Sequence, residues 1–322
     1  MKKKIMSMLF TGVLAAGMLA GCGDNTNTTA DAGADTAGTE TYGAQDETQP
    51  EAGSEAAGAF DAAEYVSVYS REDGSGTRGA FIELFGIEEK DESGEKIDNT
   101  TVEAVITNST DVMLTSVASD TYGIGYVSLG SLDESIVKAV NIDGAEATVE
   151  NIKSGAYAIA RPFNIATSSE VSEAAQDFIN YIMSAEGQAV VTESGYIGSD
   201  GAAAFASNGA KGKVVIGGSS SVAPVMEKLI EAYKALNPNV TIELQTSDST
   251  TGMTGAMDGT LDIGMASRAL KDTEIEGGLT GTEIAMDGIA VIVNPTNPTE
   301  DLTAENVKGI FTGEITNWDG LN

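Results

Sequence analysis

Residues 70–81, SREDGSGTRGAF, stand between a strand-like run, YVSVYS (65–70), and a helix-like run, FIELFGI (81–87). Small hydroxyl residues and glycines therefore lie where a helix should begin. A helix N-terminus presents unpaired backbone N–H groups and a partial positive charge. Glycine lets the backbone approach a ligand closely, and Ser and Thr add hydroxyl donors. We predict an anion-binding turn formed by Arg71, Ser75, Gly76 and Thr77, with Asp73 orienting the guanidinium.

A second junction of the same kind lies farther along the chain. The run GGSSS (217–221) follows a short buried strand, VVI (214–216), and precedes VAPVMEKLIEAYKAL (222–236). Apolar residues of the last run recur at helical spacing. Ser221 fits an N-cap, and Pro224 fits a first helical turn. Either turn alone is explained by helix capping, but two of them suggest an oxyanion held in a cleft between two lobes.

The composition excludes several classes of function. The chain has 322 residues, with 49 acidic and 17 basic side chains and a formal net charge of −32. Such a balance argues against nucleic-acid binding through phosphate neutralisation. The sequence contains no histidine, which removes the usual general base and metal ligand. No acidic run has metal-ligand spacing, so we predict no metal, no cofactor and no catalysis.

The first residues are typical of an export signal. Met1-Lys2-Lys3-Lys4 precedes an apolar stretch (5–20) that is short for a membrane span. It ends in Leu19-Ala20-Gly21-Cys22, which resembles the bacterial lipobox, and Cys22 is the only cysteine. An ordinary signal peptide with a chance cysteine is the alternative. We predict a signal peptide over 1–22 and a lipid-modified Cys22 that anchors the protein to the outer face of the cell membrane.

Residues 23–63 are rich in Ala, Gly, Thr, Asp and Glu, and 23–60 contain no Lys or Arg. This composition predicts a disordered acidic tether. Beyond it, short strand-like and helix-like runs alternate on both sides of a Gly/Ala/Ser-rich connector (198–213). The alternation predicts an α/β architecture with largely parallel sheets, whose ligands bind beyond the carboxyl ends of the strands.

Several motifs resemble the extracytoplasmic phosphate-binding proteins of ABC phosphate transporters. SREDGSGTRGAF and IGYVSLG (124–130) are similar to the second half of that family. The motifs IGGSSSVAPVMEKL, DIGMASRAL, DGIAVIVNPTNP and VKGIFTGEITNWDGL are similar to its first half. The resemblance covers 64–200 and 213–322. It implies a two-lobed periplasmic-binding-protein fold of the type II-like class, with the ligand cleft between the lobes.

The two halves stand in the reverse of the family's order, which predicts a circular permutation. A chain cut from a longer reading frame is the alternative. The permuted order assigns 64–159 and 299–322 to lobe II and 160–298 to lobe I. The chain would cross between lobes at YAIARPF (157–163) and VNPTNP (293–298). Asn322 should then lie near Tyr65.

The resemblance also implies the ligand contacts. Arg71, Ser75, Gly76 and Thr77 match the family's Arg-x-Asp-Gly-Ser-Gly-Thr motif, and Asp73 matches the aspartate that holds the arginine. On lobe I, Ser220, Ser221 and Thr250 match donors. Some members have an aspartate that accepts the phosphate proton where Arg268 stands here, and Arg268 either adds a donor or faces solvent. Asp287 is the substitute acceptor, with a turn or hinge role as its alternative.

The expected function is binding of inorganic phosphate and its delivery to an ABC transporter permease. A surface phosphatase or other hydrolase is disfavoured because the chain lacks histidine and an evident metal cluster. An extracellular phosphate sensor or interaction protein remains open, as do sulfate, molybdate and tungstate as ligands.

Overall fold

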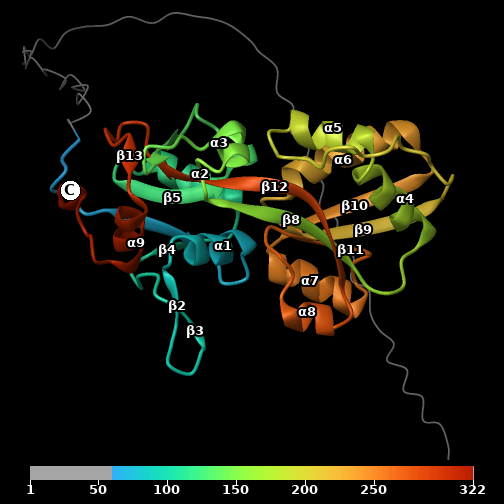
Figure 1. Cartoon of the computed structure of the whole chain (residues 1–322), viewed down its shortest axis with the longest axis horizontal. Coiled ribbons are helices and arrows are strands. Elements are labelled where there is room, and N and C mark those ends of the chain that lie inside the picture. The colour runs from blue at the N-terminus through green and yellow to red at the C-terminus, as the bar shows by residue number, and fades with distance from the viewer. Residues whose placement is uncertain (1–59, 322) are drawn as a thin grey trace, which may run out of the picture. The chain divides into compact units, whose positions relative to one another are not determined.

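The computed structural model describes residues 60–321 of the chain. Strands and helices alternate within them, as an α/β protein requires. The strands of the main sheet are β1 (Ser67–Arg71), β4 (Val105–Thr107), β5 (Gly123–Ser128), β6 (Lys138–Ala139), β8 (Ala160–Thr167), β9 (Gly212–Ser219), β10 (Val240–Ser247), β11 (Ile263–Ala266) and β12 (Thr280–Val293) (Figure 1). Two small sheets pair β2 (Glu88–Lys90) with β3 (Lys96–Asp98) and β7 (Asn141–Ile142) with β13 (Asp301–Leu302).

The helices flank these sheets. They are α1 (Gly76–Leu84), α2 (Thr110–Ser119), α3 (Val149–Ser154), α4 (Glu173–Ile182), α5 (Ala185–Glu193), α6 (Ala223–Leu236), α7 (Ser249–Asp258), α8 (Asp272–Glu276) and α9 (Ala304–Thr312), with 3-10 turns η1 (Leu129–Ser131) and η2 (Trp318–Gly320). None of the helices in residues 60–321 combines the length and the apolar content that crossing a bilayer demands.

The main sheet contains two groups of parallel strands joined by an antiparallel pair. Its order is β10-β9-β11-β8-β12-β5-β1-β4, with β6 also paired to β12. β9 is parallel to β10 and β11, and β1 is parallel to β4 and β5. β8 and β12 pair with each other in antiparallel orientation. β8 is also antiparallel to β11, and β12 is also antiparallel to β5. The carboxyl ends of each parallel group therefore form an edge where helices begin.

Each parallel group has its own hydrophobic core, as a two-lobed fold requires. In lobe II, Phe81 stacks on Tyr126 with 3.9 Å between ring centroids and meets Phe311 edge-on. In lobe I, Phe178 and Tyr233 pack against each other beneath α4 and α6. Helices α5 and α6 lie over one face of the lobe I strands, and α7 and α8 lie over the other (Figure 1).

The second crossing between lobes differs from the prediction. On β8 the core changes between Ile159 and Phe163, within the expected segment. On β12, Ala285 packs in the core of lobe I, whereas Ile289 packs in the core of lobe II. The assignment of 289–298 to lobe I and the predicted crossing at 293–298 are therefore wrong. The reason is that the long strand β12 continues past the crossing as the partner of β5. Asn294 then donates to the Ala118 carbonyl of α2 at 2.8 Å.

The described residues begin at Phe60, and residues 60–63, which were predicted to belong to the tether, contact lobe II. The Phe60 ring lies 5.2 Å from Tyr122 and 5.9 Å from Trp318, centroid to centroid. The Asp319 N–H also donates to the Ala62 carbonyl at 2.7 Å. An aromatic anchor therefore holds residues 60–63, which composition alone assigned to the tether.

The two ends of the described chain lie side by side in lobe II. Tyr65 forms an antiparallel bridge with Asn317, and the Val66 N–H donates to the Thr316 carbonyl at 2.8 Å. This adjacency is what the permuted order requires of the C-terminal segment. Asn322 itself lies outside the described residues, as do Cys22, the signal peptide and most of the tether.

The connector (198–213) is fastened to lobe I by Asp177, whose side chain is fully buried. Asp177 accepts hydrogen bonds from the Ser207 hydroxyl at 2.9 Å and the Asn208 N–H at 2.7 Å. It also accepts from Tyr233 Oη at 2.7 Å and Asn237 Nδ2 at 3.0 Å. Burial raises the pKa of Asp177, but these hydrogen bonds outweigh it and leave the pKa below its usual value.

Candidate anion-binding site

The first predicted turn places Arg71 at the carboxyl end of β1, where its side chain is buried. Ser75 is the N-cap of α1 and accepts from the Arg78 N–H at 3.3 Å. Its hydroxyl hydrogen remains available to a ligand. Gly76 and Thr77 are the first two residues of α1, so their amides lie among the helix N–H groups that lack an intrahelical acceptor.

Glu72, not Asp73, holds Arg71. The two Glu72 carboxylate oxygens accept from Arg71 Nε and Nη2, each at 2.8 Å. The prediction for Asp73 is wrong because its side chain points out of the turn, is 97% exposed, and contacts Arg78 Nη1 at 2.9 Å. The backbone of Arg71 is held as well, since its N–H donates to Tyr126 Oη at 3.0 Å. Arg71 is therefore fixed at both its main chain and its guanidinium.

The second predicted turn differs from expectation at its cap. Helix α6 begins at Ala223 with Val222 as the N-cap residue, and no side chain caps it. Ser221 is therefore not the cap, and its buried hydroxyl is free to face lobe II. The turn also needs Gly218, whose φ is 135° and whose added Cβ would lie 2.3 Å from the Met265 carbonyl oxygen.

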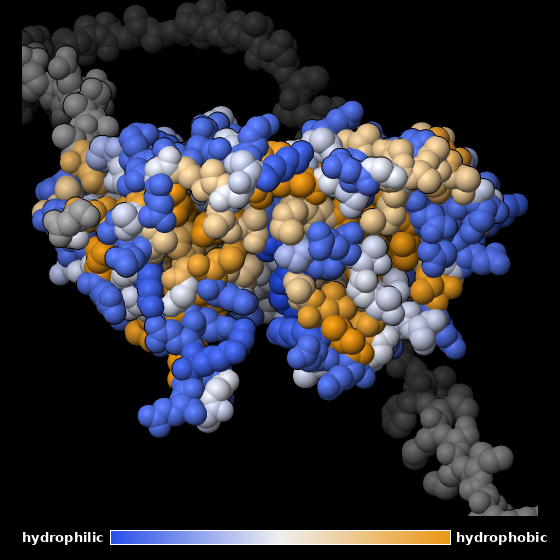
Figure 2. All heavy atoms as spheres, in the orientation of Figure 1, coloured by the Kyte–Doolittle hydropathy of each residue, from blue (hydrophilic) through white to orange (hydrophobic). Residues whose placement is uncertain are grey.

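Hydroxyl groups and one guanidinium from both lobes meet between these turns. Arg71 Nη2 donates to Ser220 Oγ at 3.1 Å, and Thr77 Oγ1 lies 2.9 Å from Ser221 Oγ. The structure thus brings together Arg71 and Thr77 of lobe II with Ser220 and Ser221 of lobe I. In the space-filling view, the molecule is notched between the lobes at the lower edge, and hydrophilic residues lie on both sides of this notch (Figure 2).

Three further hydroxyls belong to this cluster and were not predicted. Thr110 Oγ1, at the first position of α2, lies 3.2 Å from Ser221 Oγ and 3.3 Å from Ser220 Oγ. Ser267, just after β11, lies 3.3 Å from Thr77 Oγ1, and Ser249 lies 3.5 Å from Ser267. The pattern at Thr110 was visible in the sequence, because Ser109 and Thr110 also follow a strand and open a helix.

The cluster lies where the N-termini of α1, α2, α6 and α7 converge. Each of these ends carries a partial positive charge and unpaired N–H groups. Helix α7 reaches the cluster because Gly252 packs directly on Gly218: a Cβ added at Gly252 would lie 2.7 Å from the Gly218 Cα. Four helix ends from two lobes therefore create a local anion site in a chain whose formal charge is −32.

The chain is similar to known proteins along its whole length. The family model described as the PBP superfamily domain matches residues 34–186 and 203–321. Phosphate-binding protein PstS 2 of Streptococcus agalactiae serotype V is 50% identical over 323 residues, which is 100% of this chain and 99% of that protein. The chain belongs to the phosphate-binding protein (PstS) family.

Relatives from Streptococcus pneumoniae agree. Phosphate-binding protein PstS 2 of serotype 4 is 46% identical over 257 residues, which is 80% of this chain and 87% of that protein. A crystal structure of a phosphate ABC transporter, phosphate-binding protein from S. pneumoniae TIGR4 has a TM-score of 0.64 at 45% identity. It matches 80% of this chain and 100% of that one. Because the S. agalactiae alignment spans both chains, that relative has its segments in the same order.

Thr250, a ligand donor by resemblance to this PstS family, has a different partner here. Its N–H and its Oγ1 both donate to the Gly74 carbonyl, each at 3.2 Å. This contact ties α7 of lobe I to the turn of lobe II. Its neighbour Ser249 occupies the cluster instead. Thr250 is therefore placed as a contact between lobes, and we do not assign it a direct bond to the ligand.

Arg268 neither faces solvent nor offers a free charge. Its Nη2 and Nη1 donate to Glu274 at 2.7 Å and 2.9 Å. Burial raises the pKa of Glu274, but the hydrogen bond and charge of Arg268 help to keep that pKa below its usual value. The charge of the guanidinium is therefore balanced by Glu274 beside the site.

Asp287 lies on β12 at the crossing between lobes. It accepts from the Ser128 hydroxyl at 3.0 Å and lies 3.1 Å from Arg161 Nη2. No hydrogen bond in residues 60–321 joins Asp287 to the hydroxyl cluster. Burial raises the pKa of Asp287 to about 6, although the charge of Arg161 lowers it.

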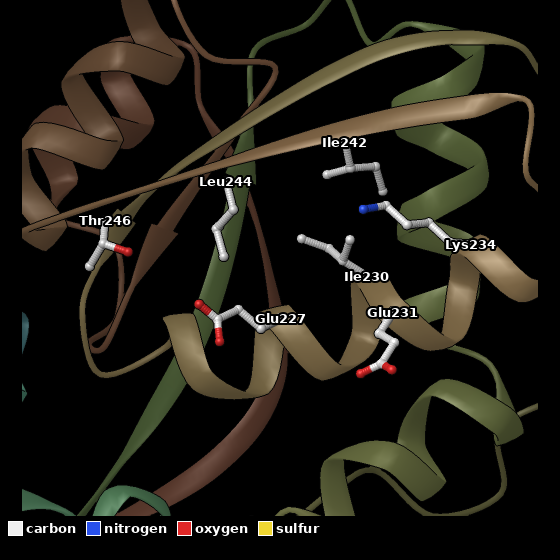
Figure 3. Close-up of a pocket in the computed structure, with 7 residues that line it drawn as sticks. All are labelled: Glu227, Ile230, Glu231, Lys234, Ile242, Leu244 and Thr246. Atoms are coloured by element: carbon white, nitrogen blue, oxygen red, sulfur yellow. The ribbon is translucent and has the colours of Figure 1, made fainter.

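Two other features of the described residues do not compete with the cluster. A surface groove lies between α6 and β10, where Ile230 and Leu244 face the hollow and Glu227 and Glu231 project from the helix (Figure 3). Carboxylates beside an apolar groove disfavour an oxyanion. No three Asp, Glu or Cys side chains in residues 60–321 converge as a metal site.

Proposed function

We propose that this protein binds inorganic phosphate in the cleft between its lobes and delivers it to the permease of an ABC transporter. One observation carries the proposal: hydroxyl groups from both lobes meet Arg71 of lobe II at a point where four helices begin. Preorganised donors of this kind, in a site that excludes water, bind a tetrahedral oxyanion without a net positive protein charge. Membership of the PstS family supports phosphate as the ligand.

The ligand contacts follow from the cluster. We assign Arg71, Ser75, Gly76 and Thr77 as donors from lobe II, and Ser220 and Ser221 as donors from lobe I. To these we add Thr110 and Ser267, which lie within 3.3 Å of predicted donors. Since donors come from both sides, ligand binding stabilises the closed arrangement of the lobes, and opening about β8 and β12 releases it.

We also propose that the protein acts outside the cytoplasmic membrane. The basic residues 2–4, the apolar stretch and the lone Cys22 support export and lipid attachment. Residues 23–59 would then form the acidic tether that lets the binding unit reach the permease.

Calorimetric titration of residues 24–322 with phosphate, arsenate and sulfate tests the ligand. We expect binding of phosphate and of arsenate, which has the same shape and protonation behaviour, and the sulfate titration shows whether the site distinguishes a protonated oxyanion from a fully ionised one. Binding of sulfate or molybdate without phosphate would overturn the assignment. Deletion of the gene that encodes this protein should reduce phosphate uptake by the cells. Unchanged uptake would indicate a sensing role instead.

A further inference from the structure

Arg161 is a buried cation whose hydrogen-bond donors are not used within the described chain. Its side chain is 2% exposed, and Nε, Nη1 and Nη2 form no hydrogen bond with any residue from 60 to 321. The Asp287 carboxylate, 3.1 Å from Nη2, is its ion-pair partner. Buried donors are normally paired, because an unpaired polar group loses its hydration without compensation. Acceptors for Arg161 therefore have to come from outside residues 60–321, and a bound ligand or water can supply them.

The strand registers place Arg161 between the two groups of parallel strands. On β8, Asn164 lies opposite Ala266, the last residue of β11, so Arg161 extends beyond the carboxyl end of that strand. On its other side, Asp287 lies opposite Arg161, and Ile289 of the same strand lies opposite Ser128, the last residue of β5. Arg161 therefore stands between the carboxyl ends of the two parallel groups, the level at which Ser267 and Arg71 also lie.

The charges around Arg161 favour the binding of an anion beside it. Burial lowers the pKa of Arg161 to about 10, the Asp287 charge raises it, and the charge of Arg71 lowers it further. The buried guanidinium remains charged at neutral pH and lies close enough to Arg71 to be repelled by it. The guanidinium carbon Cζ of Arg161 lies 5.4 Å from the centre of the Phe163 ring. This cation–π contact helps to orient the guanidinium. Two buried guanidinium groups near each other are stabilised when an anion lies between them.

We propose that Arg161 is a second arginine of the anion site and donates hydrogen bonds to the bound oxyanion, directly or through one water. Asp287 is then the counterion that holds Arg161 in the absence of ligand. This inference rests on the proposed function and adds a cation from the strand that links the lobes. It also replaces the predicted role of Asp287 as an acceptor of the ligand's proton.

A linked pair of variants tests the proposal, with phosphate as the calorimetric probe. Arg161→Gln should weaken phosphate binding about tenfold or more, because a charged donor is lost. Asp287→Asn should tighten it severalfold, because the ligand no longer competes with a carboxylate for Arg161. In the Arg161→Gln background, Asp287→Asn should have no such effect. A purely structural ion pair would change the melting temperature without this dependence.

The outcomes are separable. If the wild-type protein does not bind phosphate, the proposed function fails. If the wild type binds and a folded Arg161→Gln protein keeps its affinity within twofold, only this inference fails. Should Arg161→Gln not fold, the neutral double variant Arg161→Gln/Asp287→Asn keeps the test, and wild-type affinity in it would overturn the proposal. Lys213→Gln, an exposed cation of lobe I, is the control and should leave affinity unchanged.

Discussion

Arg71 shows how single contacts set the properties of the site. The two carboxylate oxygens of Glu72 accept from Arg71 Nε and Nη2 in a bidentate pair, which fixes the plane of the guanidinium. The same Nη2 also reaches Ser220 of lobe I. Since its charge is already paired, Arg71 acts as a directed donor more than as a free charge. In the proposed site, Thr77 would be the complementary uncharged donor in the first turn of α1.

At this scale we expect Arg71→Ala and Thr77→Val each to weaken phosphate binding by about 1–3 kcal/mol, the value of a hydrogen bond to a charged partner. Calorimetry of the purified variants measures the change. Thr115→Val is a matched control, because the Thr115 hydroxyl donates to the Asp111 carbonyl within α2 and does not belong to the hydroxyl cluster. Wild-type affinity in both site variants would place the ligand elsewhere.

A second residue-scale prediction concerns Asp177. Asp177→Asn should lower the free energy of unfolding at pH 7 by roughly 2–3 kcal/mol, since hydrogen bonds to a buried charge are weakened. The pKa of Asp177 in the folded state lies below the ordinary aspartate value of 3.8. Its contribution is therefore complete above about pH 4 and disappears as the pH falls through the folded value. Urea unfolding at pH 7 and pH 3 should show the gap between variant and wild type narrowing, and a constant gap would contradict this.

At the scale of elements, two helix starts decide how the lobes meet. Because α6 begins at Ala223, Ser221 is left out of the helix and faces Thr77 and Thr110. Because α1 begins with Gly76, lobe I can approach its first turn closely. A Cβ added at Gly76 would lie 2.5 Å from Ser249 Oγ and 2.8 Å from Ser267 Oγ.

Gly76→Ala should therefore hinder closure and weaken phosphate binding about tenfold, with little change in melting temperature. Gly79→Ala is the matched control in the same helix, since its Cβ would meet nothing within 4 Å. That control should keep wild-type affinity and gain up to about 1 kcal/mol of stability from helix propensity. Equal affinities for the two variants would show that the lobes do not close on α1.

At the scale of the whole described unit, β8 and β12 connect the two cores, and the ion pair of Arg161 and Asp287 lies on them. A titration at this position acts on both lobes together. Burial raises the folded-state pKa of Asp287 from 3.8 to about 6, so the folded protein binds this proton more tightly than the unfolded chain does.

The stabilising contribution of that proton is complete below about pH 4 and is lost as the pH rises through about 6. Relative to Asp287→Asn, which cannot titrate, the wild type should lose stability between pH 4 and pH 6. Thermal unfolding of both proteins from pH 4 to pH 8 measures this difference. Parallel stability curves would show that Asp287 does not titrate in this range.

The sequence by itself determined the local chemistry. The two strand–turn–helix junctions, the candidate donors Arg71 and Thr77, and the α/β alternation follow from capping rules, anion-binding chemistry and hydrophobic periodicity, which act over a few residues. Ser220 and Ser221 were implied as donors by the resemblance to the family. The motifs also predicted the family and the cleft between lobes. A Phe at position 60 was the one local signal that the tether prediction ignored.

Only the tertiary structure decided which of these groups meet. Glu72 in place of Asp73, Thr110 in the cluster, Glu274 on Arg268 and the ion pair of Arg161 with Asp287 depend on strand register and side-chain direction. These are set by packing between segments far apart in the chain, where no short-range rule applies. The position of the crossing on β12 has the same cause, because a long strand continues as far as its partner strands and the cores on either side allow.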